Sequence, residues 1–122
     1  MEKDNSVYQF IIENVSSLIS RHALDGTYLF ASPTSRPLLG YEPEELVGRS
    51  AYDFFHADDL VRIRQAHEET LGQFGVARVV YRIRHKLGHF VWFETISRVI
   101  VDEVTGTPVE IVATSNDITL FK

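Results

Sequence analysis

The feature that most constrains the fold is a long stretch, residues 76–116, with the pattern of three consecutive β-strands. Residues 76–86 and 109–116 alternate apolar with polar or basic side chains, and residues 90–101 are β-branched, aromatic and almost continuously apolar. The connections between these runs are short and contain Gly, Asp and Pro. Period-two runs joined by short turns predict antiparallel neighbours in one sheet. The rest of the chain must therefore cover this sheet.

Length and composition restrict the class of protein. A chain of 122 residues with 44% hydrophobic and 24% charged residues is long and apolar enough to fold as one domain. The net charge of −5 argues against nucleic acid as a partner, because phosphate binding requires positive charge. The chain has no cysteine, which excludes disulfides and cysteine nucleophiles and suits a reducing compartment. No apolar run approaches a membrane span, so we expect a cytoplasmic domain without membrane insertion.

Before the three strands, the pattern alternates between helix and strand signals. Ser6 and Gln9 have the spacing of a capping box, and apolar residues follow at helical spacing, so we predict a helix over residues 6–16. Strands are predicted over residues 18–23 and 28–31, joined by an Asp-Gly turn.

A helical block separates these strands from the later three. Short helices are predicted at residues 37–40 and 43–48, each ended by a glycine, and residues 50–55 supply aromatic side chains for the core. A longer helix is predicted from Asp58, as its cap, to Leu71. Strand runs separated by a helical block predict an α+β fold with helices packed on one antiparallel sheet.

Both faces of the predicted sheet carry apolar residues. One face has Val79, Tyr81, Ile83, Phe93, Thr95, Val99, Ile111 and Ala113; the other has Trp92, Ile96, Ile100 and Val112 among charged residues. This placement requires a one-residue offset at the Gly88 hairpin, as a bulged turn gives. Since a solvent-exposed face would not carry Trp92 and Ile96, we expect either the N-terminal helix or a second copy of the chain to cover it. The predicted dimer face comprises Val7, Phe10, Ile11, Val15, Trp92 and Ile96.

Five short motifs resemble those of PAS domains, which are sensory modules of signalling proteins. They are Gly40-Tyr41-x-Pro43-Glu44-Glu45-Leu46-x-Gly48-Arg49, Phe55-His56-Ala57-Asp58-Asp59, Tyr81-Arg82-x-Arg84-x-Lys86-Leu87-Gly88-x-x-x-Trp92-x-Glu94, Asp102-Glu103-x-Thr105-Gly106-x-Pro108 and Asp117-Ile118-Thr119. The chain departs from the family pattern at Ala57, where Pro is usual, and at Leu87, where Asp is usual. The resemblance covers nearly the whole chain, because the motifs occur in the family's order.

The resemblance implies a five-stranded antiparallel sheet with short helices and one long helix on one face and the N-terminal helix on the other. It implies one sensor domain over residues 1–122, with its core at about 17–119 and an exit at 117–122. This exit, with Asp117, Ile118 and Thr119, would lead to an effector outside the chain, such as a histidine kinase or diguanylate cyclase. We expect Asp117 or Thr119 to cap a following helix while Ile118 or Leu120 stays packed on the sheet.

The resemblance names no ligand, so the residues must be weighed individually. Photochemical flavin is excluded because Ala51 stands where the light-sensing members carry cysteine. Haem requires an axial imidazole; His67 on the apolar helix face is the candidate, but a core or rim histidine bonded to a neighbour is favoured. Hydroxyls among aromatic residues can orient a small neutral ligand, but the favoured interpretation of these positions is packed strand residues. The candidate lining is Phe54, Ile63, His67, Leu71, Val79, Tyr81, Ile83, Phe93, Thr95, Ser97, Ile111, Ala113 and Ser115.

No catalytic or metal-binding constellation stands out. We interpret Asp58 and Asp59 as cap and dipole partner of the long helix. Arg78, Arg82, Arg84 and Lys86 are expected to form cross-strand ion pairs with acids such as Glu94. Together with the resemblance to PAS domains, which implies sensing, this predicts a non-catalytic regulatory sensor. A ligand-free dimerisation module is the alternative of a different class.

Overall fold

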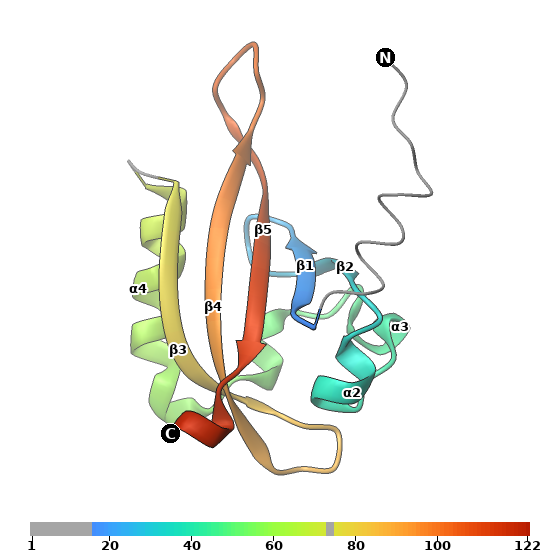
Figure 1. The fold of residues 1–122 in the computed structure, drawn as a ribbon. Helices are drawn as coiled ribbons and strands as arrows, with labels where there is room; N and C mark the ends of the chain where they lie inside the picture. The colour runs from blue at the N-terminus through green and yellow to red at the C-terminus, as the bar shows by residue number, and fades with distance from the viewer. Residues whose placement is uncertain (1–15, 73–74) are drawn as a thin grey trace.

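The computed structural model describes residues 16–72 and 75–122 (Figure 1). The predicted N-terminal helix, with Val7, Phe10, Ile11 and Val15, lies outside the described residues. In chain order the elements are β1 (Leu18–His22), β2 (Tyr28–Ala31), α2 (Ser35–Leu39), α3 (Pro43–Leu46), η1 (Ala51–Phe54), η2 (Ala57–Asp59), α4 (Leu60–Leu71), β3 (Val76–Arg84), β4 (Phe90–Val101), β5 (Pro108–Asp117) and η3 (Thr119–Phe121).

The strands form one antiparallel sheet in the order β2-β1-β5-β4-β3. The helices lie on one side of it, with α4 alongside β3 and the short helices beside β1 and β2 (Figure 1). This confirms the predicted five-stranded α+β architecture. Side chains from both layers form the core, including Leu39, Leu46, Phe54 and Ile63 from the helical layer and Ile83 and Phe93 from the sheet.

The β3–β4 hairpin keeps the predicted faces together. Tyr81 lies opposite Phe93, and Ile83 lies opposite Val91. His85 and His89 close the loop through the His85 N–H, which donates to the His89 carbonyl. Gly88 has a φ of 105°, the left-handed conformation that a three-residue bulged loop requires. Gly88 therefore allows the bulged turn that the placement of apolar residues on the two faces predicted.

β4 and β5 extend beyond their neighbours. β3 pairs with β4 only as far as Arg98, and β1 pairs with β5 only from Ile111 onward. The remaining part of β4 and β5 is a two-stranded ribbon that projects from the molecule (Figure 1). Val101, Val104 and Val109 are exposed on it.

The outer edge of β3 is occupied by the segment that leads into α4. The Arg82 carbonyl accepts a hydrogen bond from the His56 N–H (3.0 Å), and the Arg82 N–H donates to Asp59 Oδ2 (2.7 Å). Arg62 Nη1 donates to the Val80 carbonyl. These bonds satisfy backbone groups that an edge strand otherwise presents to other chains.

The predicted role of Asp58 as the cap of the long helix is wrong. Residues 57–59 form a 3-10 turn, and the Asp58 N–H donates to His56 Nδ1 (3.0 Å). Asp59 occupies the cap position of α4, but its side chain makes no cap hydrogen bond. Its carboxylate binds two guanidinium groups and a strand N–H instead, because charge-assisted donors outcompete the neutral amides of the first helical turn.

Candidate functional site: an internal cavity and the exit segment

A cavity of about 90 Å³ lies between the sheet, η1 and α4. This is several times the volume that one ordered water needs. Of the predicted lining residues, the structure places Ile63, His67, Val79, Tyr81, Ile83, Phe93, Thr95, Ser97, Ile111, Ala113 and Ser115 around this cavity. Whether a ligand occupies it stays a prediction.

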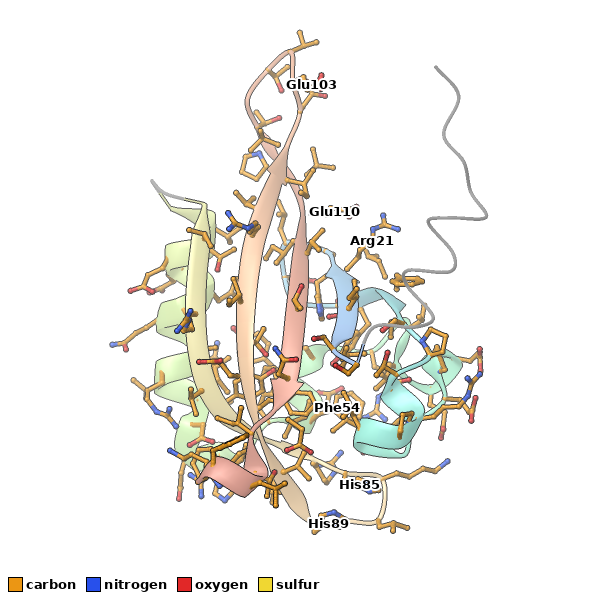
Figure 2. The ribbon with its side chains drawn as sticks, in the orientation of Figure 1. Arg21, Phe54, His85, His89, Glu103 and Glu110 are labelled. Atoms are coloured by element: carbon orange, nitrogen blue, oxygen red, sulfur yellow. The ribbon has the colours of Figure 1, made fainter. Side chains whose placement is uncertain are left out.

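Phe54 and Leu71 do not line the cavity, contrary to the sequence prediction. Phe54 is buried in the core beside the short helices, where it packs edge-on against Tyr28 and Tyr41 (Figure 2). Leu71 lies near the end of α4 and borders a separate outer depression. The aromatic run at residues 50–55 follows a 3-10 turn, whose periodicity turns Phe54 away and directs Tyr52 and Phe55 to the cavity.

Sequence reasoning missed the part of the lining that β1, the following turn and the helices contribute. The additional lining residues are Leu18, Ser20, His22, Gly26, Tyr28, Ala51, Tyr52, Phe55, Ala66 and Thr70. The period-two spacing of Leu18, Ser20 and His22 was the available signal for β1. Ala66 and Thr70 follow Ile63 at helical spacing.

Three hydroxyls form a chain on the sheet side of the cavity. Tyr81 Oη lies 2.7 Å from Thr95 Oγ1, which lies 2.7 Å from Ser115 Oγ. Burial raises the pKa of Tyr81, so its phenol stays protonated. Three hydroxyl protons serve two internal hydrogen bonds, which leaves one proton at an end of the chain. This arrangement can donate to a ligand or accept from it by reversing direction.

His22 forms a second polar group in the cavity wall. Its Nδ1 lies 3.1 Å from the Gly26 carbonyl and its Nε2 lies 2.9 Å from Ser20 Oγ. Because a carbonyl only accepts, Nδ1 carries the proton and Nε2 accepts from the serine hydroxyl. Burial lowers the pKa of His22, which favours this neutral form.

His67 ties three elements together at the rim of the cavity. Its Nε2 donates to the Leu24 carbonyl in the β1–β2 turn (2.7 Å), and its Nδ1 accepts from the Tyr52 hydroxyl in η1 (2.7 Å). His67 and Tyr52 also line the outer depression, so they form the wall between it and the cavity. An axial bond to haem iron requires a ring nitrogen, and both nitrogens of His67 are engaged. The geometry agrees with a rim histidine bonded to its neighbours.

The arginine stripe on β3 pairs with acids from several elements. Arg78 reaches Glu94 on β4 (3.7 Å), as predicted, whereas Arg82 binds Asp59 (2.8 Å) and Lys86 binds Glu45 of α3 (2.7 Å). Arg84 lies over the Phe54 ring. Among the residues that the structure describes, no group of three or more His, Cys, Asp or Glu is arranged to hold a metal ion.

The exit segment forms a short turn on β4. Asp117 Oδ1 accepts hydrogen bonds from the Thr119 N–H (2.9 Å) and hydroxyl (2.6 Å), and the Ile118 N–H donates to the Trp92 carbonyl (2.9 Å). The element that follows is the 3-10 turn η3. Ile118 is half-buried, while Leu120 is 96% exposed, so Leu120 does not pack on the sheet.

The family model of the PAS fold matches residues 28–115. The chain belongs to the PAS family. It is 35% identical over 104 residues to the aryl hydrocarbon receptor nuclear translocator homolog of Drosophila melanogaster, covering 84% of this chain and 16% of that protein. It is 36% identical over 92 residues to hypoxia-inducible factor 1-alpha of Bos taurus, covering 75% of this chain and 11% of that protein. The chain thus spans a small part of these relatives.

Solved PAS structures share the fold. The PAS-B domain of Drosophila melanogaster Cycle with bound ethylene glycol superposes with a TM-score of 0.77 at 25% identity, covering 83% of this chain and 99% of that one. A PAS domain from Colwellia psychrerythraea superposes with a TM-score of 0.85 at 22% identity, covering 95% and 98%. This PAS domain is therefore a member of a sensory-module family. No helix in its described part is long and apolar enough to cross a membrane.

Proposed function

We propose that this PAS domain is a non-catalytic, cytoplasmic regulatory sensor that binds a small neutral ligand in its internal cavity. It relays occupancy through residues 117–119 to a linked effector such as a histidine kinase or a diguanylate cyclase. The observation that carries the proposal is a mostly apolar, uncharged cavity in the core of the fold, with a few hydroxyl and imidazole groups in its wall, connected by β4 and β5 to the exit segment.

The lining defines the ligand chemistry. None of the described lining residues is Asp, Glu, Lys or Arg, and His22 is held neutral by burial. A charged ligand would have no opposite charge there to offset its lost hydration. The hydroxyl chain through Thr95 and the Ser20–His22 pair offer hydrogen bonds to a ligand with hydroxyl groups. The similar Cycle PAS-B domain has been solved with ethylene glycol bound and, as a Trp-to-Ala variant, with glycerol bound, which supports this ligand class.

The test is a glycerol titration of the isotope-labelled chain followed by amide chemical shifts. We expect saturable shifts at Thr95, Ser115 and Ser20. Thr95→Val preserves side-chain shape but breaks the hydroxyl chain, so glycerol affinity should fall roughly tenfold. Thr114→Val is the matched control, because Thr114 neighbours Ser115 on β5 and is exposed on the opposite face. Absent shifts, or equal losses in both variants, would contradict the cavity as a glycerol site.

A second candidate function is self-association through the outer sheet face. Ile96 and Ile100 are 37% and 44% exposed there, although such side chains usually face a core or an interface. A homodimer over this face would bury them and would match the ligand-free alternative. Sedimentation at increasing concentration should show a dimer that Ile96→Lys converts to monomer, while Val61→Lys on the exposed side of α4 leaves the dimer intact. A wild-type monomer at all concentrations removes this candidate.

A further inference from the structure

Asp59 is a buried carboxylate at the junction of α4 and β3. Its side chain is 1% exposed. Oδ1 accepts from Arg62 Nη2 (2.7 Å) and Arg82 Nη2 (2.8 Å), and Oδ2 accepts from the Arg82 N–H (2.7 Å) and Arg82 Nε (3.1 Å). Both oxygens are therefore saturated with donors, three of which belong to one residue. Asp59 fixes the position and orientation of the Arg82 guanidinium.

Arg82 in turn lies over the only tryptophan of the chain. Arg82 and Trp92 are direct cross-strand partners, and the guanidinium carbon lies 4.9 Å from the centre of the Trp92 ring. A second cation, Lys122 Nζ, lies 4.5 Å from the same centre. Two cations at one ring repel each other unless one is compensated. The Asp59 carboxylate compensates Arg82 and leaves the ring available to Lys122.

The backbone of Trp92 holds the same segment. Its N–H donates to Thr119 Oγ1 (3.0 Å), and its carbonyl accepts from the Ile118 N–H (2.9 Å). Trp92 therefore contacts the exit segment through its ring, its N–H and its carbonyl. A displacement of Trp92 would act on all three contacts.

We propose that Arg82 is a positioning residue through which Asp59, at the start of α4, controls the docking of residues 118–122 on Trp92. α4 and β3 both contribute to the cavity wall, through Ile63 and through Tyr81 and Ile83 on either side of Arg82. A change in the spacing of α4 and β3 alters the Asp59–Arg82 contact directly. That regulatory use rests on the proposed sensor function. The contacts themselves exist without a ligand and are tested without one.

The experiment uses the full chain without added ligand. Trp92 emission and the hydrogen-exchange rates of the Trp92 and Ile118 amides are compared between wild type, Asp59→Asn and Arg82→Lys. Lysine keeps the charge of Arg82 but cannot bind both carboxylate oxygens and cover the ring together. In both variants we expect a changed emission spectrum and roughly three- to tenfold faster exchange at Ile118, as the loss of a cation–π contact and weakened hydrogen bonds allow.

Glu110→Gln is the matched control. Glu110 also receives a bidentate arginine, from Arg21 Nε (2.6 Å) and Nη2 (2.7 Å), but it lies near the start of β5, at the opposite end from the exit segment (Figure 2). The Glu110→Gln variant should have the same Trp92 emission spectrum and the same Ile118 exchange rate as wild type. The Val99 amide, bonded to the Gly75 carbonyl near the far end of β4, reports general destabilisation, and its exchange should accelerate less than that of Ile118 in Asp59→Asn and Arg82→Lys.

Two outcomes would overturn the proposal. One is an unchanged Trp92 spectrum and Ile118 exchange rate in Arg82→Lys, which remains informative if Asp59→Asn does not fold. The other is an equal response in Glu110→Gln or at Val99. Failure of glycerol binding would remove the sensor role and leave these contact measurements unaffected, so the two proposals fail separately.

Discussion

Gly40 ends α2 with a φ of 79°, and the ring of His85 lies directly against it. A Cβ built on Gly40 would lie 2.8 Å from His85 Cε1 and 3.2 Å from Lys86 Cβ. The Lys86 N–H also donates to the Leu39 carbonyl (2.8 Å). The left-handed residue that terminates α2 is thus also the surface on which the β3–β4 hairpin docks. Gly48 has a similar φ of 90° but no other atom within 4 Å of such a Cβ.

This pair separates backbone strain from steric contact. Gly48→Ala should cost about 1 kcal/mol, the strain of an L-residue in the left-handed region. Gly40→Ala adds displacement of the hairpin and should cost about 2–3 kcal/mol. Urea unfolding of both variants measures the difference. Equal losses of unfolding free energy in the two variants would mean that the hairpin shifts without any loss of stability.

His67 links separate elements of the fold through the hydrogen bonds of its ring. Its hydrogen bonds join α4 to the β1–β2 turn and to η1, and all three surround the cavity rim. The other hydrogen bonds of this turn include the Gly26 N–H to the Ala23 carbonyl (2.9 Å) and the Ala51 N–H to the Gly26 carbonyl (3.1 Å), whereas His67 is its link to α4. Loss of the histidine should therefore loosen the turn before it loosens the sheet.

We expect His67→Leu to lower the free energy of unfolding by about 2 kcal/mol, because it leaves the Leu24 carbonyl and the Tyr52 hydroxyl without partners. Tyr52→Phe removes only the second bond and should cost about 1 kcal/mol. Amide exchange at Gly26 should accelerate in the first variant far more than in the second. If Tyr52→Phe lowers the free energy of unfolding as much as His67→Leu does, the hydrogen bond from His67 to the Leu24 carbonyl does not contribute to stability.

For the molecule as a whole, buried titratable groups set the dependence of stability on pH. Burial lowers the pKa of His22 below its ordinary value of 6.5, and burial with His89 lowers that of His85. The Arg82 and Arg62 donors lower the pKa of Asp59 from 3.8. In each case the unfolded chain binds a proton at a higher pH than the folded chain does. Stability therefore falls as the pH decreases through each window.

The free energy of unfolding should be level near neutrality and decline in two stages. The first begins below about pH 6.5 and ends once the pH has passed the folded pKa of His22. The second begins below about pH 4 and comes from Asp59 together with other carboxylates whose pKa is lowered by hydrogen bonds, such as Glu110 with Arg21. His22→Gln should weaken the first stage and leave the second, as urea midpoints measured across the pH range would show. If His22→Gln loses as much stability as wild type in the first stage, that loss comes from groups other than His22.

Much of the fold follows from local sequence signals, and the parts that do not are those decided by long-range pairing. Alternation and turn residues located β3, β4 and β5, and Gly88 marked the bulged hairpin. The cavity contribution of Ser20 and His22 depends on the pairing of β1 with β5, which no local window contains. Asp59 looked like a helix-start residue because its partner, Arg82, lies on a strand far along the chain.

The groups that occupy the outer edge of β3 also bear on how copies of the chain behave in concentrated solution. An uncovered strand edge is a template to which an identical strand can add, and each addition creates the next template. His56, Asp59 and Arg62 remove that template by bonding the edge within the chain. Strong acid protonates Asp59 and weakens its hydrogen bonds to the β3 edge. We therefore expect β3 to pair with strands of other chains under these conditions. The Asp59 carboxylate, at the start of α4, is thus also expected to slow fibre formation by the domain.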